Sequence, residues 1–441
     1  MIVTQINREG AHMSLQEISP EIARLVKEEE ERQKKSLRFI PSENYASPAV
    51  LEALGSIFTN KYGEGYPGRR YYQGQPKTDE LEVLVQEKAK KVFGYPHVNV
   101  QALSGAPANL AVYAAFLQPN KGGKIMAMRL DHGGHLTHGS PVSVTGSWFE
   151  FCHYGVNSDD VLDMEEIRQK ALEFKPDIIV CGYTAYPRTI DFEAFGKIAK
   201  EVGAICLADV SHIAGLIAGG AHPSPFPHCD VVTFTTHKTL RGPRAAIILS
   251  KDEEQAKKID DAVFPGLQGG PHFNTIAAIG VALDEALDEK FKAYSAQIVK
   301  NAKALSQGLV DRGYHIVSGG TDNHLLLLDT RKSKNVPGKR VAKAMEKVHL
   351  VCNFNTVPNA SEKQKPLAPD GIRMGTPALT TRGMKEKDME KIAEFIDRAL
   401  SNIKSGKVKK GMSTWVDDDK AKTLAAEVAE FASQFPIFSY E

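Results

Sequence analysis

The sequence predicts an α/β fold, with a large domain around a mostly parallel sheet and a smaller C-terminal α/β domain. From about residue 90 to about residue 250, short apolar strands alternate with helical stretches, which is typical of a parallel sheet covered by helices on both faces. A second series of strands and helices begins after about residue 300. The length of 441 residues also exceeds one domain of roughly 150 residues.

The elements of this fold can be assigned in chain order. Residues 17–35 form an amphipathic helix in which Glu30 and Glu31 precede Lys34 and Lys35 by four positions, the favourable order for ion pairs on a helix. We expect an N-terminal arm over residues 1–45, a large domain over 46–305 and a small domain over 306–441.

Strands are expected at Lys124–Met128, Asp177–Gly182, Ala204–Ala208, Val231–Thr235 and Ala245–Leu249, and in the small domain at Tyr314–Ser318, Leu325–Leu328 and Leu350–Asn353. Helices are expected over Val161–Phe174, Asp191–Val202, 275–312, Arg340–Val348, 384–404 and 417–434, with a basic linker at Lys404–Gly411.

Composition excludes several classes of protein. The 55 basic and 54 acidic residues give a net charge of +1, whereas nucleic-acid binding needs an excess of basic charge on one face. No apolar run reaches the ~18 residues of a membrane span, and Met1–Ser14 has no apolar secretory segment. The five cysteines are scattered without a Cys-x-x-Cys pair, which predicts a reducing, cytoplasmic location without disulfides or a zinc site.

Asp209 and Lys238 are the main candidates for chemistry. Asp209 ends one predicted strand and Lys238 follows the next, so both should project into one crevice at the carboxyl ends of the sheet. A lysine that forms a Schiff base and a carboxylate that pairs with a protonated pyridine nitrogen suit pyridoxal 5'-phosphate (PLP). Either residue alone is more often structural, and the combination carries the prediction.

Two glycine-containing loops are candidates for phosphate binding, because a phosphate needs backbone donors and small residues. Ser104–Asn109 opens a helical run, and Gly266–Pro271 is a second loop. Each by itself is more often a plain helix start or turn. The His-rich segment Asp131–Gly139 has irregular spacing and no evident carboxylate-rich partner, so we expect a histidine stacked on a flat cofactor rather than a metal ligand.

Two further candidates concern the substrate. Arg373, within Gly371–Pro377, is suited to planar, two-point recognition of a carboxylate. The segment Lys61–Tyr72 places four tyrosines and Glu64 in a glycine-rich loop. Glu64 is therefore a candidate acid or base.

These motifs resemble serine hydroxymethyltransferases, PLP-dependent enzymes of the aspartate-aminotransferase fold type. The resemblance runs from about residue 18 to 440 and is carried by Pro41–Asn44, Thr59–Tyr62, Glu64–Pro67, Gly133–Pro141, Thr236–Arg244, Phe264–Pro271 and Ser318–His324. It implies a transferase of one-carbon metabolism and amino-acid biosynthesis that moves the serine hydroxymethyl group to tetrahydrofolate, giving glycine and 5,10-methylenetetrahydrofolate. It also implies a cytoplasmic homodimer, or a tetramer built from it, whose active site is shared between subunits.

The resemblance implies a role for each matching residue. Lys238 carries the cofactor beside His237, Asp209 pairs with the pyridine nitrogen, His212 lies near the phenolic oxygen and His135 stacks on the ring. The remaining cofactor residues are Ser104, Gly105, Ala106, Thr184, Thr235 and Tyr62, with Gly269 and Gly270 from the partner subunit. Serine and glycine are bound by Ser42, Glu64, Tyr72 and Arg373, and Glu64 carries the proton. Tyr62, Glu64 and Tyr72 reach in from the neighbouring subunit. Folate contacts Leu130, Gly134, His135, Leu136, Asn355, Lys365, Pro366 and Leu367.

Several positions depart from the family pattern. Ala106 stands where a hydroxyl residue is usual, Ser211 where alanine is usual, and Gln73–Lys77 replaces the usual stretch after the tyrosine pair. Two alternatives to the main activity stay open at this point. One is a related PLP enzyme: a threonine- or allothreonine-type aldolase, a transaldolase or an α-methylserine hydroxymethyltransferase. The other is a non-catalytic binding protein, which the presence of Lys238, Asp209 and Arg373 disfavours.

Overall fold

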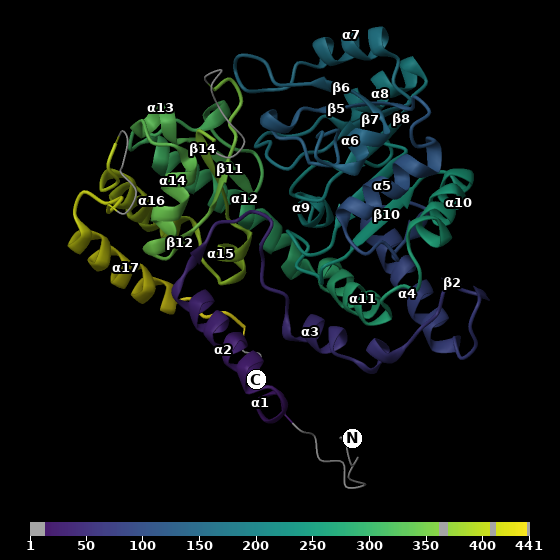
Figure 1. Ribbon diagram of the computed structural model, residues 1–441, viewed down its shortest axis with the longest axis horizontal. Coiled ribbons are helices and arrows are strands. Elements are labelled where there is room, and N and C mark those ends of the chain that lie inside the picture. Colours follow the sequence, from purple (N-terminus) through teal and green to yellow (C-terminus); the bar gives the residue numbers. More distant parts are fainter. Residues whose placement is uncertain (1–13, 361–368, 406–411, 439–441) are drawn as a thin grey trace.

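The computed structural model describes residues 14–360, 369–405 and 412–438. Figure 1 shows two α/β lobes, with the purple helix α2 (Pro20–Lys35) running away from them beside α17 (Asp418–Ser433). No helix of these described ranges is long and apolar enough to cross a membrane.

The larger lobe is built on a seven-stranded sheet with the order β4-β10-β9-β8-β7-β5-β6. Strands β6, β5, β7, β8 and β9 are parallel, whereas β10 runs antiparallel to both β9 and β4. The strand bounds are β4 (His97–Asn99), β5 (Lys124–Met128), β6 (Glu150–Tyr154), β7 (Ile178–Cys181), β8 (Ile205–Asp209), β9 (Val231–Thr235) and β10 (Ala246–Ser250). This arrangement confirms the predicted mostly parallel sheet.

Both faces of this sheet are buried, because successive side chains of a strand point to opposite faces. In β5, Ile125 and Ala127 join one apolar cluster with α5 (Gly105–Phe116) and α10 (Glu253–Asp261), whereas Met126 and Met128 join another on the other face. That second cluster contains side chains from α4 (Pro76–Phe93), α7 (Met164–Phe174), α8 (Phe192–Val202), α9 (Ala214–Ala218) and α11 (Phe273–Leu287).

The smaller lobe holds a three-stranded antiparallel sheet, β11-β14-β13. Leu37 and Phe39 of the N-terminal segment pack into its core. The elements are β11 (Leu325–Asp329), β12 (Leu350–Val351), β13 (Asn353–Asn355), β14 (Gly371–Gly375), α12 (Glu289–Val310), α13 (Thr330–Lys334), α14 (Gly338–Lys347), α15 (Pro377–Thr381), α16 (Glu386–Ser401) and α17, with β1 (Leu37–Arg38) paired to β12. The domain limits at residues 45 and 305 stay a prediction.

The short elements complete the description. They are α1 (Leu15–Ile18), α3 (Pro48–Leu54), η1 (Ile57–Asn60), β2 (Gly65–Tyr66), β3 (Arg69–Arg70), η2 (Leu130–His132), α6 (Val144–Trp148), η3 (Ala262–Leu267) and η4 (Val317–Gly319).

The structure differs from the strands predicted from the sequence in three places. Tyr314–Ser318 is not a strand: only Ile316 forms an isolated bridge, and Ser318 adopts a left-handed φ of 57°. The strand expected at Leu350–Asn353 divides at Cys352, and its halves join different sheets. The edge strand β6 was not predicted, because polar residues interrupt its apolar pattern. Of the predicted linker Lys404–Gly411, residues 406–411 lie outside the described residues.

Candidate active site

Asp209 and Lys238 lie at the carboxyl ends of the neighbouring strands β8 and β9. Asp209 is the last residue of β8, and Lys238 lies three residues beyond the end of β9. Burial lowers the pKa of Lys238 to about 8, an effect that Asp209 opposes and that Arg373 and Arg244 reinforce. An amine with this pKa is partly neutral at physiological pH and is therefore able to act as a nucleophile.

Three side chains hold the carboxylate of Asp209. Its Oδ2 accepts hydrogen bonds from Asn109 Nδ2 at 2.8 Å and His138 Nε2 at 3.2 Å, and its Oδ1 accepts one from Ser211 Oγ at 2.6 Å. The ring nitrogen Nδ1 of His138 accepts from the backbone N–H of His135 at 3.1 Å, which leaves Nε2 as the nitrogen that donates to Asp209. Burial alone would raise the pKa of Asp209, but these contacts, that of His138 foremost, keep it well below the usual range.

An ionised, buried carboxylate at a strand end is what a protonated pyridine nitrogen needs as a partner. Sequence reasoning assigned no role to Asn109 or His138, although both lie in motifs that it singled out. The contact between Asn109 and Asp209 could not be predicted from the local sequence, because the two residues are 100 positions apart.

The remaining histidines of the site are uncharged. Burial lowers the pKa of His135 to about 4 and that of His237 to about 3. Nδ1 of His135 accepts a hydrogen bond from the backbone N–H of Thr137 at 3.2 Å, which fixes the ring orientation. Nδ1 of His212 lies 3.1 Å from Nε2 of His324, and the two rings are stacked. Neutral imidazole rings are suited to packing against a flat aromatic cofactor.

The N-terminus of α5 forms a cradle for an anion beside Asp209 and Lys238. Ser104 precedes the helix, and its hydroxyl makes no hydrogen bond to the helix backbone. A Cβ on Gly105 would come within 2.8 Å of Thr235 Cγ2, so only glycine fits at this contact. The first backbone N–H groups of a helix have no partner within the helix and attract phosphate. Ala106, in the first turn, is exposed and offers no hydroxyl.

The residues at this site fit PLP. The chemistry of the donor set matches each part of the cofactor: an amine at Lys238, an anionic partner at Asp209 and a phosphate cradle at Ser104 and Gly105. His237 adds an independent indication, since its buried Nδ1 has no hydrogen-bond partner within the described ranges.

Arg373 faces this pocket from the smaller lobe. It lies in the middle of β14, where Nη1 donates to the backbone carbonyl of Thr184 at 2.6 Å and Nε donates to Asn353 Oδ1 at 3.2 Å. No acidic side chain of the described residues pairs with it, and burial lowers its pKa to about 10. Ser42 is the neighbour of Pro41 in the chain. Pro41 packs closely on Gly375 at the end of β14, since a Cβ on Gly375 would lie 2.8 Å from it.

The tyrosine loop forms a separate group within this chain. Tyr62 donates a hydrogen bond to Glu64 Oε1 at 3.1 Å, and its ring packs edge-to-face on Tyr72 with centroids 5.1 Å apart. A Cβ on Gly269 would lie 3.2 Å from Glu64, and one on Gly270 would lie 3.4 Å from the Tyr62 ring. The structure thus brings together the five residues assigned to the neighbouring subunit, but does not join them to Lys238 by any contact among the described residues.

The predicted folate residues are placed in part. Leu130 and Leu136 are exposed at 42% and 48% beside His135, and Gly134 is buried where a Cβ would collide with the carbonyl of Met128. Asn355 lies on β13, with its Nδ2 bonded to the carbonyl of Thr356. Lys365, Pro366 and Leu367 lie outside the described residues.

Two groups in the described part of the chain bring possible metal ligands close together. His135, His138 and Asp209 form one, and Cys181, Cys206 and Cys229 form the other. In the first, His138 and Asp209 already bind each other. The three cysteines are free and belong to the apolar core beneath the sheet. The expected lack of a metal stays a prediction.

The fold and the site define the class of PLP-dependent enzymes of the aspartate-aminotransferase fold type. A model of the family described as serine hydroxymethyltransferase matches residues 15–396. Proteins with that name from Desulfotalea psychrophila and Sorangium cellulosum are 54% and 52% identical to this chain, over 97% and 96% of its length and the same shares of theirs. One from Acidothermus cellulolyticus is 51% identical over 95% of both chains. The chain therefore belongs to the serine hydroxymethyltransferase family and is a transferase.

Proposed function

We propose that this chain binds PLP on Lys238 and catalyses the reversible transfer of the serine hydroxymethyl group to tetrahydrofolate, giving glycine and 5,10-methylenetetrahydrofolate. One observation carries the assignment of residues. Lys238 and the ionised Asp209 come from neighbouring strand ends, and a buried arginine without a carboxylate partner among the described residues, Arg373, faces them.

The bound cofactor supplies an electron sink for the bond that breaks at the substrate Cα. Asp209 would hold a proton on the ring nitrogen, because hydrogen bonds from His138 and Ser211 outweigh burial and keep its pKa low. His135 covers the ring as a neutral imidazole, and Arg373 fixes the substrate carboxylate. The N-terminus of α5 holds the phosphate with Ser104 and Gly105, without a hydroxyl from Ala106.

Glu64 holds and moves the proton at the serine hydroxyl, and Tyr62 orients its carboxylate. Tetrahydrofolate enters beside Leu130 and Leu136, whose exposed side chains suit the apolar face of a pterin. Leu130, Gly134, Leu136 and Asn355 are proposed as its contacts, together with Lys365–Leu367.

A second copy of the chain completes the site in this proposal. Glu64, Tyr62 and Tyr72 are grouped apart from Lys238, and apolar side chains close to them in the sequence are exposed. Ile57 is exposed at 78%, Leu84 at 49% and Val83 at 45%. Exposed apolar patches of this kind mark interfaces, and a twofold interface would bring the loop of each subunit to the other's Lys238. We propose a homodimer, or a tetramer of such dimers, located in the cytoplasm, where its five free cysteines stay reduced.

Turnover of serine with and without tetrahydrofolate tests the activity. We expect glycine formation that depends on tetrahydrofolate. Cleavage of threonine or allothreonine, or transfer from α-methylserine, in place of that reaction would favour one of the related PLP activities and refute the main assignment.

Complementation tests the shared site. Lys238→Ala removes one half of the site and Glu64→Gln impairs the other, so a re-associated mixture contains mixed dimers with one intact site. We expect about a quarter of the parent activity from random pairing, well above either variant alone. A mixture no more active than the two variants would refute a site shared between subunits.

A further inference from the structure

The loop that carries Tyr62 and Glu64 is tied to the start of α4 by a buried glutamine, Gln75. Its side chain is 6% exposed, although the neighbouring Tyr72 and Gln73 are exposed. Nε2 of Gln75 donates to the backbone carbonyl of Tyr62 at 3.0 Å and to that of Gln73 at 3.2 Å. Its Oε1 accepts a hydrogen bond from Thr78 Oγ1 at 2.6 Å, and the carbonyl of Gln75 lies 2.8 Å from the same hydroxyl.

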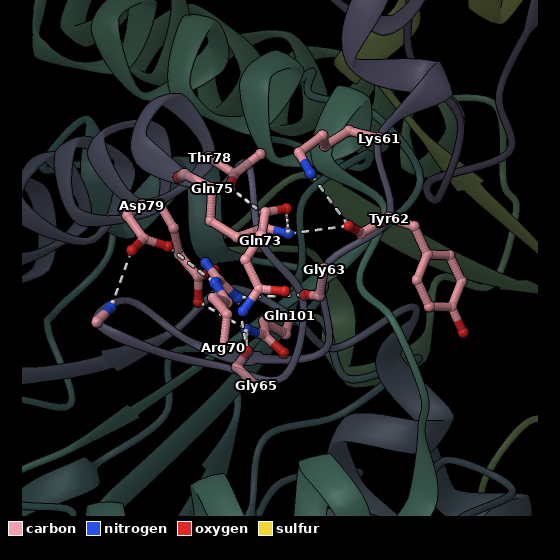
Figure 2. A network of polar contacts seen from close by, with 12 residues as sticks. Lys61, Tyr62, Gly63, Gly65, Arg70, Gln73, Gln75, Thr78, Asp79 and Gln101 are labelled. Atoms are coloured by element: carbon pink, nitrogen blue, oxygen red, sulfur yellow. Dashed lines mark hydrogen bonds and ion pairs between the residues drawn. The ribbon is translucent and has the colours of Figure 1, made fainter.

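All polar atoms of the Gln75 amide are thus engaged. Figure 2 shows these bonds, with Gln75 between the two limbs of the loop and the Tyr62 ring pointing away from the network. The fit is close at the intervening residue, since a Cβ on Gly63 would come within 2.5 Å of Gln75 Oε1. Only glycine leaves room for this amide.

The backbone carbonyls of Glu64 and Gly65, which follow in the loop, also accept hydrogen bonds. Arg70 Nη1 donates to the carbonyl of Gly65 at 2.6 Å, and Gln101 Nε2 donates to the same oxygen at 3.0 Å. The carbonyl of Glu64 accepts from the backbone N–H of Tyr71 at 3.1 Å. Glu82 accepts hydrogen bonds from both Arg70 and Gln101. The backbone on either side of Glu64 is therefore fixed by a buried frame, and Gln75 is the member that fixes the Tyr62 side.

We propose that Gln75 is a positioning residue for the Tyr62–Glu64 pair. Its bond to the Tyr62 carbonyl sets the direction of the Tyr62 phenol, which in turn orients the Glu64 carboxylate. This inference rests on the proposed function, because it assigns the effect of Gln75 to the half of the site that handles the proton.

Three single variants test the proposal in the intact, cofactor-loaded enzyme. Gln75→Ala removes both donors. Gln75→Glu keeps the shape and the acceptor for Thr78, but sets a carboxylate oxygen against the two carbonyls. Gln73→Ala is the matched control, since Gln73 lies in the same loop with an exposed side chain. We expect Gln75→Ala and Gln75→Glu each to lower folate-dependent kcat about fivefold, as for the loss of one ordinary hydrogen bond, with PLP absorbance per chain unchanged and Gln73→Ala at the parent rate.

The decisive measurement is a double-variant cycle with Glu64→Gln. If Gln75 acts through Glu64, Gln75→Ala lowers kcat in the parent but has little effect in the Glu64→Gln background. Additive losses, or a Gln75→Glu variant with the parent kcat, would overturn the role of Gln75 and leave the proposed function standing. A parent protein without folate-dependent turnover would instead refute the proposed function itself, so the two failures are distinguishable.

Discussion

Replacement of Arg373 by alanine should remove recognition of the substrate carboxylate without loss of the cofactor. A guanidinium has five N–H donors, of which one is donated to Thr184 and one to Asn353. The others have no acceptor among the described residues and are available for a two-point bond to a carboxylate. Arg373 is 7% exposed, so water competes weakly for these donors.

The size of the effect follows from the number of bonds. Hydrogen bonds to charged groups contribute about 1.5–3 kcal/mol each, so a two-point contact contributes about 3–6 kcal/mol. This corresponds to a loss of roughly 10²–10⁴ in glycine affinity for Arg373→Ala. Arg373→Lys keeps the charge but not the planar fork, and we expect it to recover only part of the affinity.

Spectral titration of the loaded enzyme with glycine and with methylamine measures this loss. Methylamine has the amino group but no carboxylate, so its affinity should change little in Arg373→Ala. An equal loss for both ligands would show that the substitution damages the pocket as a whole. An unchanged glycine affinity would refute the assignment of Arg373 directly.

Three further predictions concern the proton carrier, the lysine and the buried frame. Glu64→Gln should keep PLP bound and slow hydroxymethyl transfer by roughly 10²–10⁴, measured as folate-dependent kcat; full turnover would contradict the role of Glu64. Because the pKa of Lys238 is lowered to about 8, its neutral, nucleophilic form increases as the pH rises through about 8. The rate at which cofactor-free enzyme takes up PLP should therefore level off just above that pH, and a rate still rising steeply at about pH 10, near the ordinary lysine pKa, would contradict this. Glu82→Ala removes one of the two carboxylates that pair with the buried Arg70, at 2.7 Å, and leaves Asp79 at 2.9 Å, so it should lower the free energy of unfolding by about 3 kcal/mol, the lower end expected for a broken buried pair. Glu80→Ala, at the exposed pair with Lys77, should cost less than about 1 kcal/mol, and equal losses in chemical denaturation would refute the argument.

The large sheet was predictable from the sequence because its signal is local. Strands such as Lys124–Met128 and Val231–Thr235 are short apolar runs between turns, and the structure places β5 and β9 at these same residues. A stretch that the sequence pattern predicts as one helix can form two helices, because a capping residue starts a new helix within it. The expected helix over 275–312 divides at Asp288, whose side chain accepts a hydrogen bond from the backbone N–H of Lys290. A cap of this kind inside a periodic run is visible only when the pattern is read for breaks.

The smaller lobe was harder to predict, because strand formation there depends on distant partners. Tyr314–Ser318 is apolar enough for a strand, but Ser318, Gly319 and Gly320 all adopt positive φ values and turn the chain away. Similarly, the surroundings of Asp209 could not be predicted, since Asn109, His138 and Ser211 come from three separate segments. The positions of the reactive groups followed from the sequence, whereas the side chains that adjust their pKa values required the fold.

The charges around the pocket suit a nearly neutral chain to the two anionic ligands proposed for it, a phosphate and a carboxylate. The +1 net charge conceals a local excess of positive charge at Lys238 and Arg373. Arg373 helps to lower the pKa of Lys238, and Asp209 is the anion that opposes this lowering. Burial, with a smaller contribution from Arg373, lowers the pKa values of His135, His212 and His324, so each of these rings stays uncharged beside the two cations. A phosphate at the start of α5 and a carboxylate at Arg373 would supply the missing negative charge. In the proposed function, binding of the cofactor and of the amino acid would therefore relieve an electrostatic cost that the folded chain carries by itself.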